Sequence, residues 1–422
     1  MKNSTGEEIE IEIEKLVAEG KGFVKTNGKP LFVPLSVPKD KLIVRITTSK
    51  KNYSEGEIKR ILKPSPSRTD PICPLYGECG GCNFQHISIA ERESYLNAVL
   101  KENLERIGKI KTYMVNILDP FISCKQFNYR LRGKFKCHFK NNSFYLGFLK
   151  RKSNNIVNVD YCYLMSEEIN NLIKILKTCF KKYKSDKDSL FEVQLISINN
   201  KSAAIFNFEK KDTALLTFLR EHNFFDYLEL RIKNKRSFSY PENFFFIFQE
   251  QKVHPCSFIQ CNPEVNRKIR NDIMKFINRD SSILDLYCGH GNLSLEIAKS
   301  GSYVLGIEEN PTSLSFLKNV NNYKAVRDSV SKAIKTLSRK EFSTIILDPP
   351  RAGIFDISKT LLEFNASRII YLSCDSATLC RDLGILQEKY SIVNAQVYDM
   401  FPQTSHFETM IVLENKAFIT NN

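Results

Sequence analysis

One stretch decides the fold: Ser282-Ile283-Leu284-Asp285-Leu286-Tyr287-Cys288-Gly289-His290-Gly291-Asn292. Its first five residues predict a buried strand. The two glycines that follow predict a tight turn, which lets the backbone approach a ligand closely. A helix is predicted next, over 293–300, and its first amide groups would face the same ligand. A strand, a glycine turn and a helix in this order begin a doubly wound α/β sheet.

The same alternation continues toward the C-terminus and predicts a mainly parallel sheet with its ligand at the carboxyl ends of the strands. The second strand ends at Glu308, whose carboxylate can accept hydrogen bonds from both hydroxyls of a ribose. A pyrophosphate loop expects a third glycine where Ser294 stands. We therefore favour S-adenosylmethionine, a cofactor with a ribose and no phosphates. Further strands are predicted at 303–307, 344–348 and 369–373, and a helix after Pro311.

A thiol and a carboxylate lie beside strands of this predicted sheet. Cys374 follows the strand 369–373, and Glu408 precedes the apolar strand 410–413. Taken alone, each has a plainer interpretation, as a buried structural cysteine and a surface charge. Arg351 stands in Asp348-Pro349-Pro350-Arg351 where amine methyltransferases often carry an aromatic residue, which argues against amine methylation.

Together with a methyl donor, the pair suggests one chemistry. The C5 carbon of uracil is a poor nucleophile, but a thiolate that adds to C6 makes C5 enolate-like and able to attack the sulfonium methyl group. A base must then remove the C5 proton so that the thiol leaves by elimination. Cys374 suits the nucleophile and Glu408 suits the base.

The rest of the chain predicts two further domains. Residues 1–63 alternate with period two and carry a hairpin signal at Asn27-Gly28, which is typical of a small oligonucleotide-binding β-barrel. A helix is predicted over 93–110, where it could pack on the catalytic domain. The fold class is thus multidomain α/β, with three expected units: a β-barrel at 1–63, a central α+β domain at 70–260, and a Rossmann-like methyltransferase domain at 261–422.

Four cysteines have a spacing that suggests a metal site: Cys73, Cys79, Cys82 and Cys162. Four thiolates suit zinc or an iron–sulfur cluster. The paired C-x2-C knuckles that are common in zinc sites are absent, so spacing alone leaves zinc, an iron–sulfur cluster and a metal-free loop open. The chain has twelve cysteines, and a reducing compartment would keep them unpaired.

The charge balance favours a polyanionic partner. Lys and Arg total 62 against 47 Asp and Glu, which gives a formal charge of +15 in 422 residues. A Lys-rich solvated surface is the plainer alternative. The acidic N-terminus does not resemble a secretory signal and no apolar run is long enough to span a membrane, so we expect a cytoplasmic protein without a membrane partner. No obligate protein partner is indicated.

A basic stripe runs from Lys125 to Lys152, with nine cations, seven interleaved aromatic residues and no acid. The cations could neutralise phosphates, and exposed rings could stack on unpaired bases. Several of the rings belong to the buried face of a strand, because Phe135 and Phe139 alternate with Lys134 and Lys136. The cations of the stripe are Lys125, Arg130, Arg132, Lys134, Lys136, Lys140, Lys150, Arg151 and Lys152.

Four motifs resemble the RNA uracil-C5 methyltransferases of the 23S ribosomal RNA branch: DLYCGHGNLSLEIA, DPPRAG, LSCDSATLCRDL and FPQTSHFETM. The resemblance covers essentially the whole chain and includes the barrel, which resembles a TRAM domain. It implies that Cys374 is the nucleophile, Glu408 the base and the four cysteines the ligands of a [4Fe–4S] cluster. Many relatives have Phe at Tyr287 and Ala at Pro350, and neither change removes a required group. The cofactor contacts it implies are Gln260, Tyr287, Asn292, Glu308, Asp328 and Asp348.

We therefore expect an S-adenosylmethionine-dependent methyltransferase that modifies C5 of a uridine in a stem-loop or unpaired region of 23S ribosomal RNA. The cluster is expected to fix a loop rather than to take part in a redox step. A transfer RNA methyltransferase is the alternative within the class. A non-catalytic iron–sulfur RNA-binding protein is the alternative from another class, although the presence of both Cys374 and Glu408 argues against it.

Overall fold

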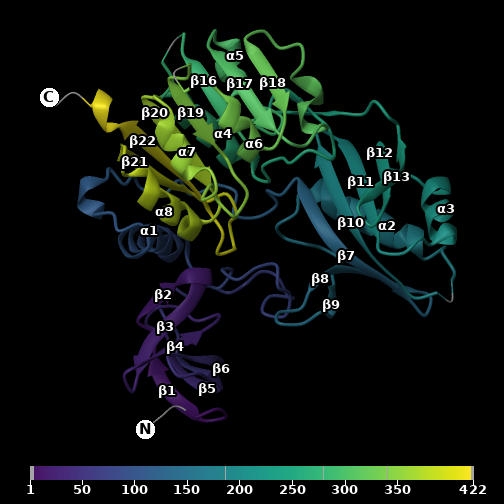
Figure 1. The fold of residues 1–422 in the computed structure, drawn as a ribbon. Helices are drawn as coiled ribbons and strands as arrows, with labels where there is room; N and C mark the ends of the chain where they lie inside the picture. Colours follow the sequence, from purple (N-terminus) through teal and green to yellow (C-terminus); the bar gives the residue numbers. More distant parts are fainter. Residues whose placement is uncertain (1–3, 186, 279, 340, 420–422) are drawn as a thin grey trace.

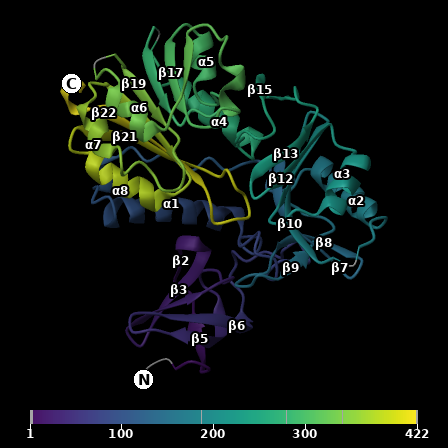
Figure 2. The same ribbon diagram turned by 45° about the vertical axis from the view of Figure 1, so that its right-hand side comes forward.

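The structure is a computed structural model that describes residues 4–185, 187–278, 280–339 and 341–419. These residues form a six-stranded sheet, two seven-stranded sheets and a two-stranded sheet. Figures 1 and 2 show the N-terminal sheet (purple) below the C-terminal one (green to yellow), with the central sheet (teal) to one side. In the described part of the chain, no helix is both long and apolar enough to cross a membrane.

The N-terminal sheet closes partly on itself around a small core that includes Leu31, Val33 and Leu42. Asn27 and Gly28 both have positive φ, 50° and 77°, as a tight hairpin turn between two strands requires. Its strands pair in the order β1-β5-β6-β4-β3-β2. They are β1 (Glu8–Glu12), β2 (Lys15–Val17), β3 (Lys21–Thr26), β4 (Lys29–Val33), β5 (Lys41–Ser49) and β6 (Ser54–Lys63), with the 3-10 turn η1 (Ala18–Gly20) after β2.

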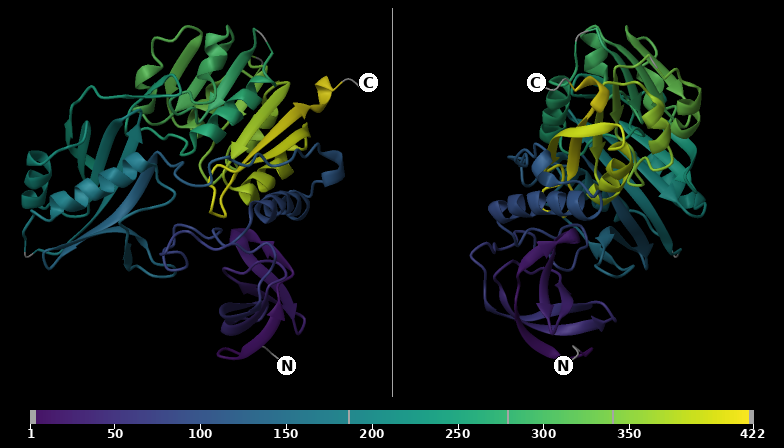
Figure 3. Two further views of the ribbon diagram at one scale, coloured as in Figure 1. Left: turned by 180° about the vertical axis from the view of Figure 1, so that it is seen from behind. Right: turned by 60° about the vertical axis from the view of Figure 1, so that its left-hand side comes forward.

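The helix α1 (Ile89–Arg106) follows the cysteine-bearing segment and begins four residues before the predicted start. Its N-cap is Ser88, whose Oγ accepts the backbone N–H of Glu91 at 3.3 Å. The predicted apolar stripe is buried from Tyr95 to Leu104 in the core of the C-terminal sheet. Figures 1 and 3 show α1 lying against α8 (Ser376–Leu386), so the segment that follows the N-terminal sheet packs on the C-terminal domain.

The central sheet has the order β13-β12-β11-β10-β7-β8-β9. One face packs its core against α2 (Glu167–Phe180) and α3 (Thr213–Glu221), and part of the other face is covered by the hairpin β14–β15. The strands are β7 (Arg132–Lys140), β8 (Ser143–Leu149), β9 (Ile156–Asn158), β10 (Ser189–Ile198), β11 (Lys201–Phe208), β12 (Tyr227–Ile232), β13 (Lys235–Tyr240), β14 (Phe246–Phe248) and β15 (Gln251–Val253), and the 3-10 turn η2 (Thr112–Met114) precedes them.

The C-terminal sheet has the order β18-β17-β16-β19-β20-β22-β21, in which the first five strands are parallel and the last two antiparallel. The strand order reverses direction between β16 and β19, and ligands bind at such a switch point. The strands are β16 (Ser282–Leu286), β17 (Tyr303–Glu308), β18 (Tyr323–Arg327), β19 (Thr344–Leu347), β20 (Arg368–Ser373), β21 (Tyr390–Tyr398) and β22 (Glu408–Asn415).

The helices of this domain are shorter than the sequence pattern predicts. The helix predicted over 293–300 is α5 (Leu295–Lys299), and the helix predicted after Pro311 is only the 3-10 turn η3 (Ser313–Phe316). Both lie where the chain turns closely around the carboxyl ends of β16 and β17. The remaining helical elements are α4 (Pro263–Met274), α6 (Val330–Thr336), α7 (Ser358–Glu363) and η4 (Lys416–Phe418).

Candidate active site

Cys374 and Glu408 meet because of the pairing of two strands. The antiparallel ladder of β20 and β22 ends at the pair Ser373–Thr409. Cys374, the residue just after β20, and Glu408, the first residue of β22, occupy the next positions beyond that pair. Asp348 follows β19, the parallel neighbour of β20, and so reaches the same edge of the sheet. The thiol and the two carboxyl groups therefore converge at the carboxyl ends of the central strands.

The carboxyl group of Glu408 is buried, with 4% of the residue exposed. Its Oε2 atom has no hydrogen-bond partner among the described residues. Burial and the neighbouring charge of Asp348 raise the pKa of Glu408 well above its ordinary value, and Arg351 partly opposes the shift. Burial also raises the pKa of Asp348 to about 7. A carboxylate with a raised pKa is a stronger base than an exposed one, which suits proton abstraction near neutral pH.

The thiol of Cys374 is half-buried beside these carboxyl groups. Burial, followed by the charge of Glu408, raises the pKa of Cys374 to about 11, while the charge of Arg351 and a hydrogen bond from it act in the opposite direction. Arg351 therefore favours the thiolate, which is the nucleophilic form. This role of Arg351 is not predicted from the sequence, although the place of Arg351 just after Asp348-Pro349-Pro350 at a strand end puts it at the same edge of the sheet.

The predicted glycine turn after β16 has the expected geometry, with φ of 57° at Gly289 and 78° at Gly291. Tyr287 also has a positive φ, 65°, which is strained for a bulky residue and typical of functional sites. The turn is tied to the end of β17, because Glu308 Oε2 accepts the backbone N–H of Gly289 at 3.1 Å and Oε1 accepts that of Asn310 at 2.7 Å. Each oxygen keeps a further lone pair that could accept a ribose hydroxyl.

Two buried polar atoms beside this turn fit a polar ligand. Gln260 Oε1 and Asp285 Oδ1 both lack a hydrogen-bond partner within the described ranges, although both residues are almost fully buried. Buried acceptors are rarely left unpaired, so a bound group that donates hydrogen bonds would satisfy them.

Two other predicted cofactor contacts, Asn292 and Asp328, already have hydrogen-bond partners within the protein. Asn292 exchanges two hydrogen bonds of 2.9 Å with Asn266 of α4, so its amide is held by a protein partner. Asp328 follows β18, and its Oδ1 accepts the backbone N–H of Ser329 at 2.7 Å. Both still lie at the edge of the sheet that carries Tyr287 and Glu308.

Comparison with known proteins identifies the family. Residues 95–214 and 243–416 match the family described as tRNA (Uracil-5-)-methyltransferase, and residues 2–59 match the TRAM domain. The chain belongs to the RNA uracil-C5 methyltransferases. It is an S-adenosylmethionine-dependent RNA (uracil-5-)-methyltransferase with an N-terminal TRAM half-barrel.

Relatives of this methyltransferase match along its whole length. The 23S rRNA (uracil(1939)-C(5))-methyltransferase RlmD of Aliivibrio salmonicida is 30% identical over 96% of both chains. An uncharacterized RNA methyltransferase of Aquifex aeolicus is 31% identical over 97% of this chain and 99% of its own. The crystal structure of the Pyrococcus abyssi tRNA (uracil-54, C5)-methyltransferase with S-adenosyl-L-homocysteine has a TM-score of 0.73, at 23% identity over 96% of this chain and 100% of its own. It shows that the fold is shared.

The four cysteines of this methyltransferase line one small pocket of about 50 Å³ between the cysteine segment, residues 70–88, and the central sheet. Burial, and then the charges of the other three thiols, raise the pKa of Cys82 to about 12. Across the described residues, no three His, Cys, Asp or Glu side chains are close enough to bind one metal ion. The four thiols nevertheless line the same pocket, so their side chains are gathered at one place in the fold.

Several cations of the basic stripe form ion pairs within the protein, which the sequence of the stripe itself does not indicate. Lys134 and Lys136 both form ion pairs with Glu192 of the neighbouring strand β10. Lys150 pairs with Glu78 at 3.3 Å and Lys152 with Glu55 at 3.2 Å, so these two cations connect the loop after β8 to the cysteine segment and the half-barrel. The expectation that several rings are buried is confirmed for Phe135 and Phe139, whereas Tyr145 is 43% exposed.

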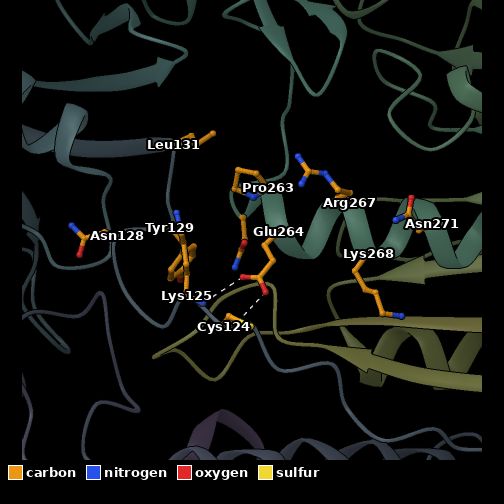
Figure 4. A pocket seen from close by; sticks show the side chains of 11 residues that line it. Cys124, Lys125, Asn128, Tyr129, Leu131, Pro263, Glu264, Arg267, Lys268 and Asn271 are labelled. Atoms are coloured by element: carbon orange, nitrogen blue, oxygen red, sulfur yellow. Dashed lines mark hydrogen bonds between the residues drawn. The ribbon is translucent and has the colours of Figure 1, made fainter.

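Two hollows flank the catalytic edge. A cleft of about 1130 Å³ lies between the half-barrel, the cysteine segment and the loop before β22, and Lys21, Asn83 and His406 line it. A pocket of about 540 Å³ lies beside the N-terminal turn of α4 (Figure 4), with Lys125, Arg267 and Lys268 around it. In this pocket the carboxylate of Glu264 already accepts the backbone N–H groups of Cys124 at 3.0 Å and Lys125 at 3.4 Å.

Proposed function

We propose that the enzyme methylates C5 of a uridine in 23S ribosomal RNA, with Cys374 as nucleophile and Glu408 as general base. The thiolate of Cys374 adds to C6 and makes C5 nucleophilic. After C5 has taken the methyl group, Glu408 accepts the C5 proton, the C5–C6 double bond forms again and the sulfur leaves. The observation that carries this proposal is the adjacent placement of the two residues at the end of the β20–β22 ladder.

We assign the cofactor to the edge formed by β16, β17 and β19. Gln260, Tyr287, Asn292, Glu308, Asp328 and Asp348 are the proposed contacts. S-adenosylmethionine supplies an electrophilic methyl group when it is bound. The unpaired buried oxygen of Gln260 and the strained turn at Tyr287 support a polar ligand here. Asn266 fixes the amide of Asn292, which would orient it for the cofactor.

We also propose that Cys73, Cys79, Cys82 and Cys162 hold a [4Fe–4S] cluster. The four thiols line one pocket, and this supports a group that takes one thiolate from each cysteine. The choice of an iron–sulfur cluster over zinc rests on the family resemblance. Methyl transfer needs no redox step, so the cluster would hold the cysteine segment in place. Residues 1–63, 70–260 and 261–422 would then act as a half-barrel, an RNA-binding domain and a methyltransferase domain.

The ribosomal target rests on sequence identity. Relatives that match 96% of the chain at 30% identity act on uracil 1939 of 23S rRNA. The half-barrel itself does not discriminate, because a tRNA methyltransferase structure aligns over 96% of this chain. The cleft lined by Lys21 and His406 and the pocket lined by Lys125 and Arg267 offer cations for the phosphates of either RNA.

The experiment that tests the target is a direct comparison of substrates. Purified enzyme and labelled S-adenosylmethionine are incubated with 23S rRNA transcripts and, separately, with unmodified tRNA transcripts, and C5-methyluridine is mapped in each. We expect one uridine-containing region of 23S rRNA to be methylated. Methylation of tRNA alone would replace the ribosomal target by the transfer RNA target while leaving the chemistry intact.

A further inference from the structure

The loop over 399–407 delivers Glu408 to the catalytic edge. It joins β21 to β22, and Glu408 is the first residue of β22. Gln403 in this loop has a φ of 66°, a left-handed conformation that few non-glycine residues adopt. A strained loop persists only where surrounding contacts hold it. The contacts of this loop therefore decide how the carboxylate is aimed.

Donors from the cysteine segment hold the middle of the loop. The carbonyl oxygen of Gln403 accepts the backbone N–H groups of Asn83 and Phe84, both at 3.1 Å. The side-chain amide of Asn83 donates to Ser405 Oγ at 2.9 Å and to the carbonyl oxygen of Glu19 in the half-barrel at 3.1 Å. Asn83 thus joins the half-barrel, the cysteine segment and the loop at one point.

Arg92 of α1 holds the start and the end of the same loop. Only 3% of its side chain is exposed, and it forms an ion pair with the fully buried Asp399. Its guanidinium also donates to the carbonyl oxygens of Thr404 and of Phe401, the latter at 3.3 Å. The same group lies 5.1 Å from the ring centroid of Phe84, the residue whose N–H binds the loop.

These contacts connect the cysteine site to the base. Asn83 is the residue after Cys82, so anything that fixes Cys82 also fixes the donors to Gln403 and Ser405. We propose that Asn83 and Arg92 are positioning residues through which the cysteine segment aims Glu408 at the C5 proton. The proposal rests on the proposed function, because it requires Glu408 to be the base.

The step concerned is the last one on the RNA. The C5 proton passes to the Glu408 carboxylate, the electrons of the C5–H bond form the C5–C6 double bond, and the electrons of the C6–S bond return to Cys374 as thiolate. A misaimed carboxylate slows this step without slowing the earlier attack by sulfur or the transfer of the methyl group. The enzyme would then stay covalently bound to methylated RNA.

The test uses full-length enzyme with Asn83→Ala, Ser405→Ala and the double variant. The side chain of Asn83 is half-buried, and its removal leaves the backbone N–H contacts to Gln403 in place. Asn207→Ala is the matched control, because Asn207 is also half-buried and donates to Asn234 at 2.9 Å, on the central sheet. Arg92→Lys keeps the positive charge but removes the several N–H donors of the guanidinium, so it tests the contacts of the same loop in a second way.

We expect Asn83→Ala to lower kcat by about 10-fold to 100-fold with an unchanged KM for RNA. A denaturation-resistant adduct with ordinary, non-fluorinated RNA should accumulate, carry the transferred methyl group and be absent from the control. Ser405→Ala should give the same adduct, and the double variant should add little to either. A raised KM without adduct would make Asn83 an RNA contact and overturn the proposal, as would unchanged kinetics. If the wild-type enzyme forms no Cys374-dependent adduct with 5-fluorouridine RNA, the proposed function itself is wrong.

Discussion

Ser373 of β20 and Thr409 of β22 form the last pair of an antiparallel ladder, and the proposed nucleophile and base are the residue just after Ser373 and the residue just before Thr409. Backbone pairing therefore sets the distance between Cys374 and Glu408, while the loop before Glu408 sets the aim of its carboxylate. The arrangement has a cost, because two buried carboxyl groups, those of Glu408 and Asp348, share one edge of the sheet.

The first prediction concerns stability. Burial and the charge of Asp348 raise the pKa of Glu408 in the folded protein above its value of about 4.3 in the unfolded chain. The folded state thus binds this proton more tightly, and the stability of the wild type falls as pH rises from that value through the folded pKa. We expect Glu408→Gln to unfold at a higher temperature at about pH 8. The increase should be about 2–4 °C for each kcal/mol of desolvation and charge repulsion that the substitution removes.

Thermal unfolding at several pH values checks this, and the difference should vanish near about pH 4. Glu414→Gln on the same strand is the control, since Glu414 pairs with Arg368 at 2.6 Å and its loss should not stabilise the protein. A Glu408→Gln protein that is less stable than wild type at about pH 8 would show that the ionised carboxylate of Glu408 does not destabilise the fold.

The second prediction concerns the reactivity of the free thiol. Because burial and the charge of Glu408 raise the pKa of Cys374 to about 11, alkylation of Cys374 by iodoacetamide should be slow at neutral pH and rise steadily with pH. Arg351→Gln should move the curve to higher pH and Glu408→Gln to lower pH. Peptide mass spectrometry follows the site. A plateau already reached at about pH 7 would contradict the electrostatics.

The third prediction concerns the basic stripe. The single carboxylate of Glu192 pairs with both Lys134 and Lys136, so Glu192→Gln should free both ammonium groups, tighten RNA binding and steepen its salt dependence. Lys134→Ala with Lys136→Ala should make the slope of log K against log salt shallower, by less than the ~1.4 expected for two free cations on single-stranded RNA. Filter binding over a salt series measures both. An unchanged slope in both variants would remove this strand from the RNA site.

The fourth prediction concerns the cysteine site. Anaerobically purified enzyme should be brown, absorb at about 400 nm and contain about four iron atoms per chain. Cys162→Ser should lose most of the iron, whereas Cys179→Ser, at a half-buried position of α2 that does not line the cysteine pocket, should keep it. Iron and zinc analysis of the three proteins checks this. A colourless protein with one zinc ion per chain would refute the cluster.

Short-range patterns predicted much of the fold. The alternation in 1–63, the glycine turn at Gly289 and Gly291, and the strands that end at Glu308 and Cys374 are local signals, and the observed elements follow them. The family resemblance adds the roles of Cys374, Glu408 and the four cysteines, and these roles are proposals. A helix is predicted after Pro311, but only the 3-10 turn η3 forms there.

Contacts between residues distant in sequence could not be predicted in the same way. Nothing in the sequence near Lys134 indicates that Glu192 will lie beside it, because the pairing of β7 with β10 decides this. Arg92 and Asp399 are 307 residues apart in the sequence, so no local pattern indicates their ion pair. The contacts of Cys256 are likewise non-local, because its thiol donates to Glu229 at 3.2 Å and accepts from Arg231 at 3.1 Å.

The most direct test of the mechanism is covalent trapping. With S-adenosylmethionine and RNA that contains 5-fluorouridine, the wild-type enzyme should form a methylated adduct that survives denaturation, because fluorine cannot be removed as a proton. Cys374→Ala should form none, and Glu408→Gln should form an adduct even with ordinary RNA. Methylation by the Cys374→Ala enzyme, or normal turnover by Glu408→Gln, would contradict the assignment of nucleophile and base.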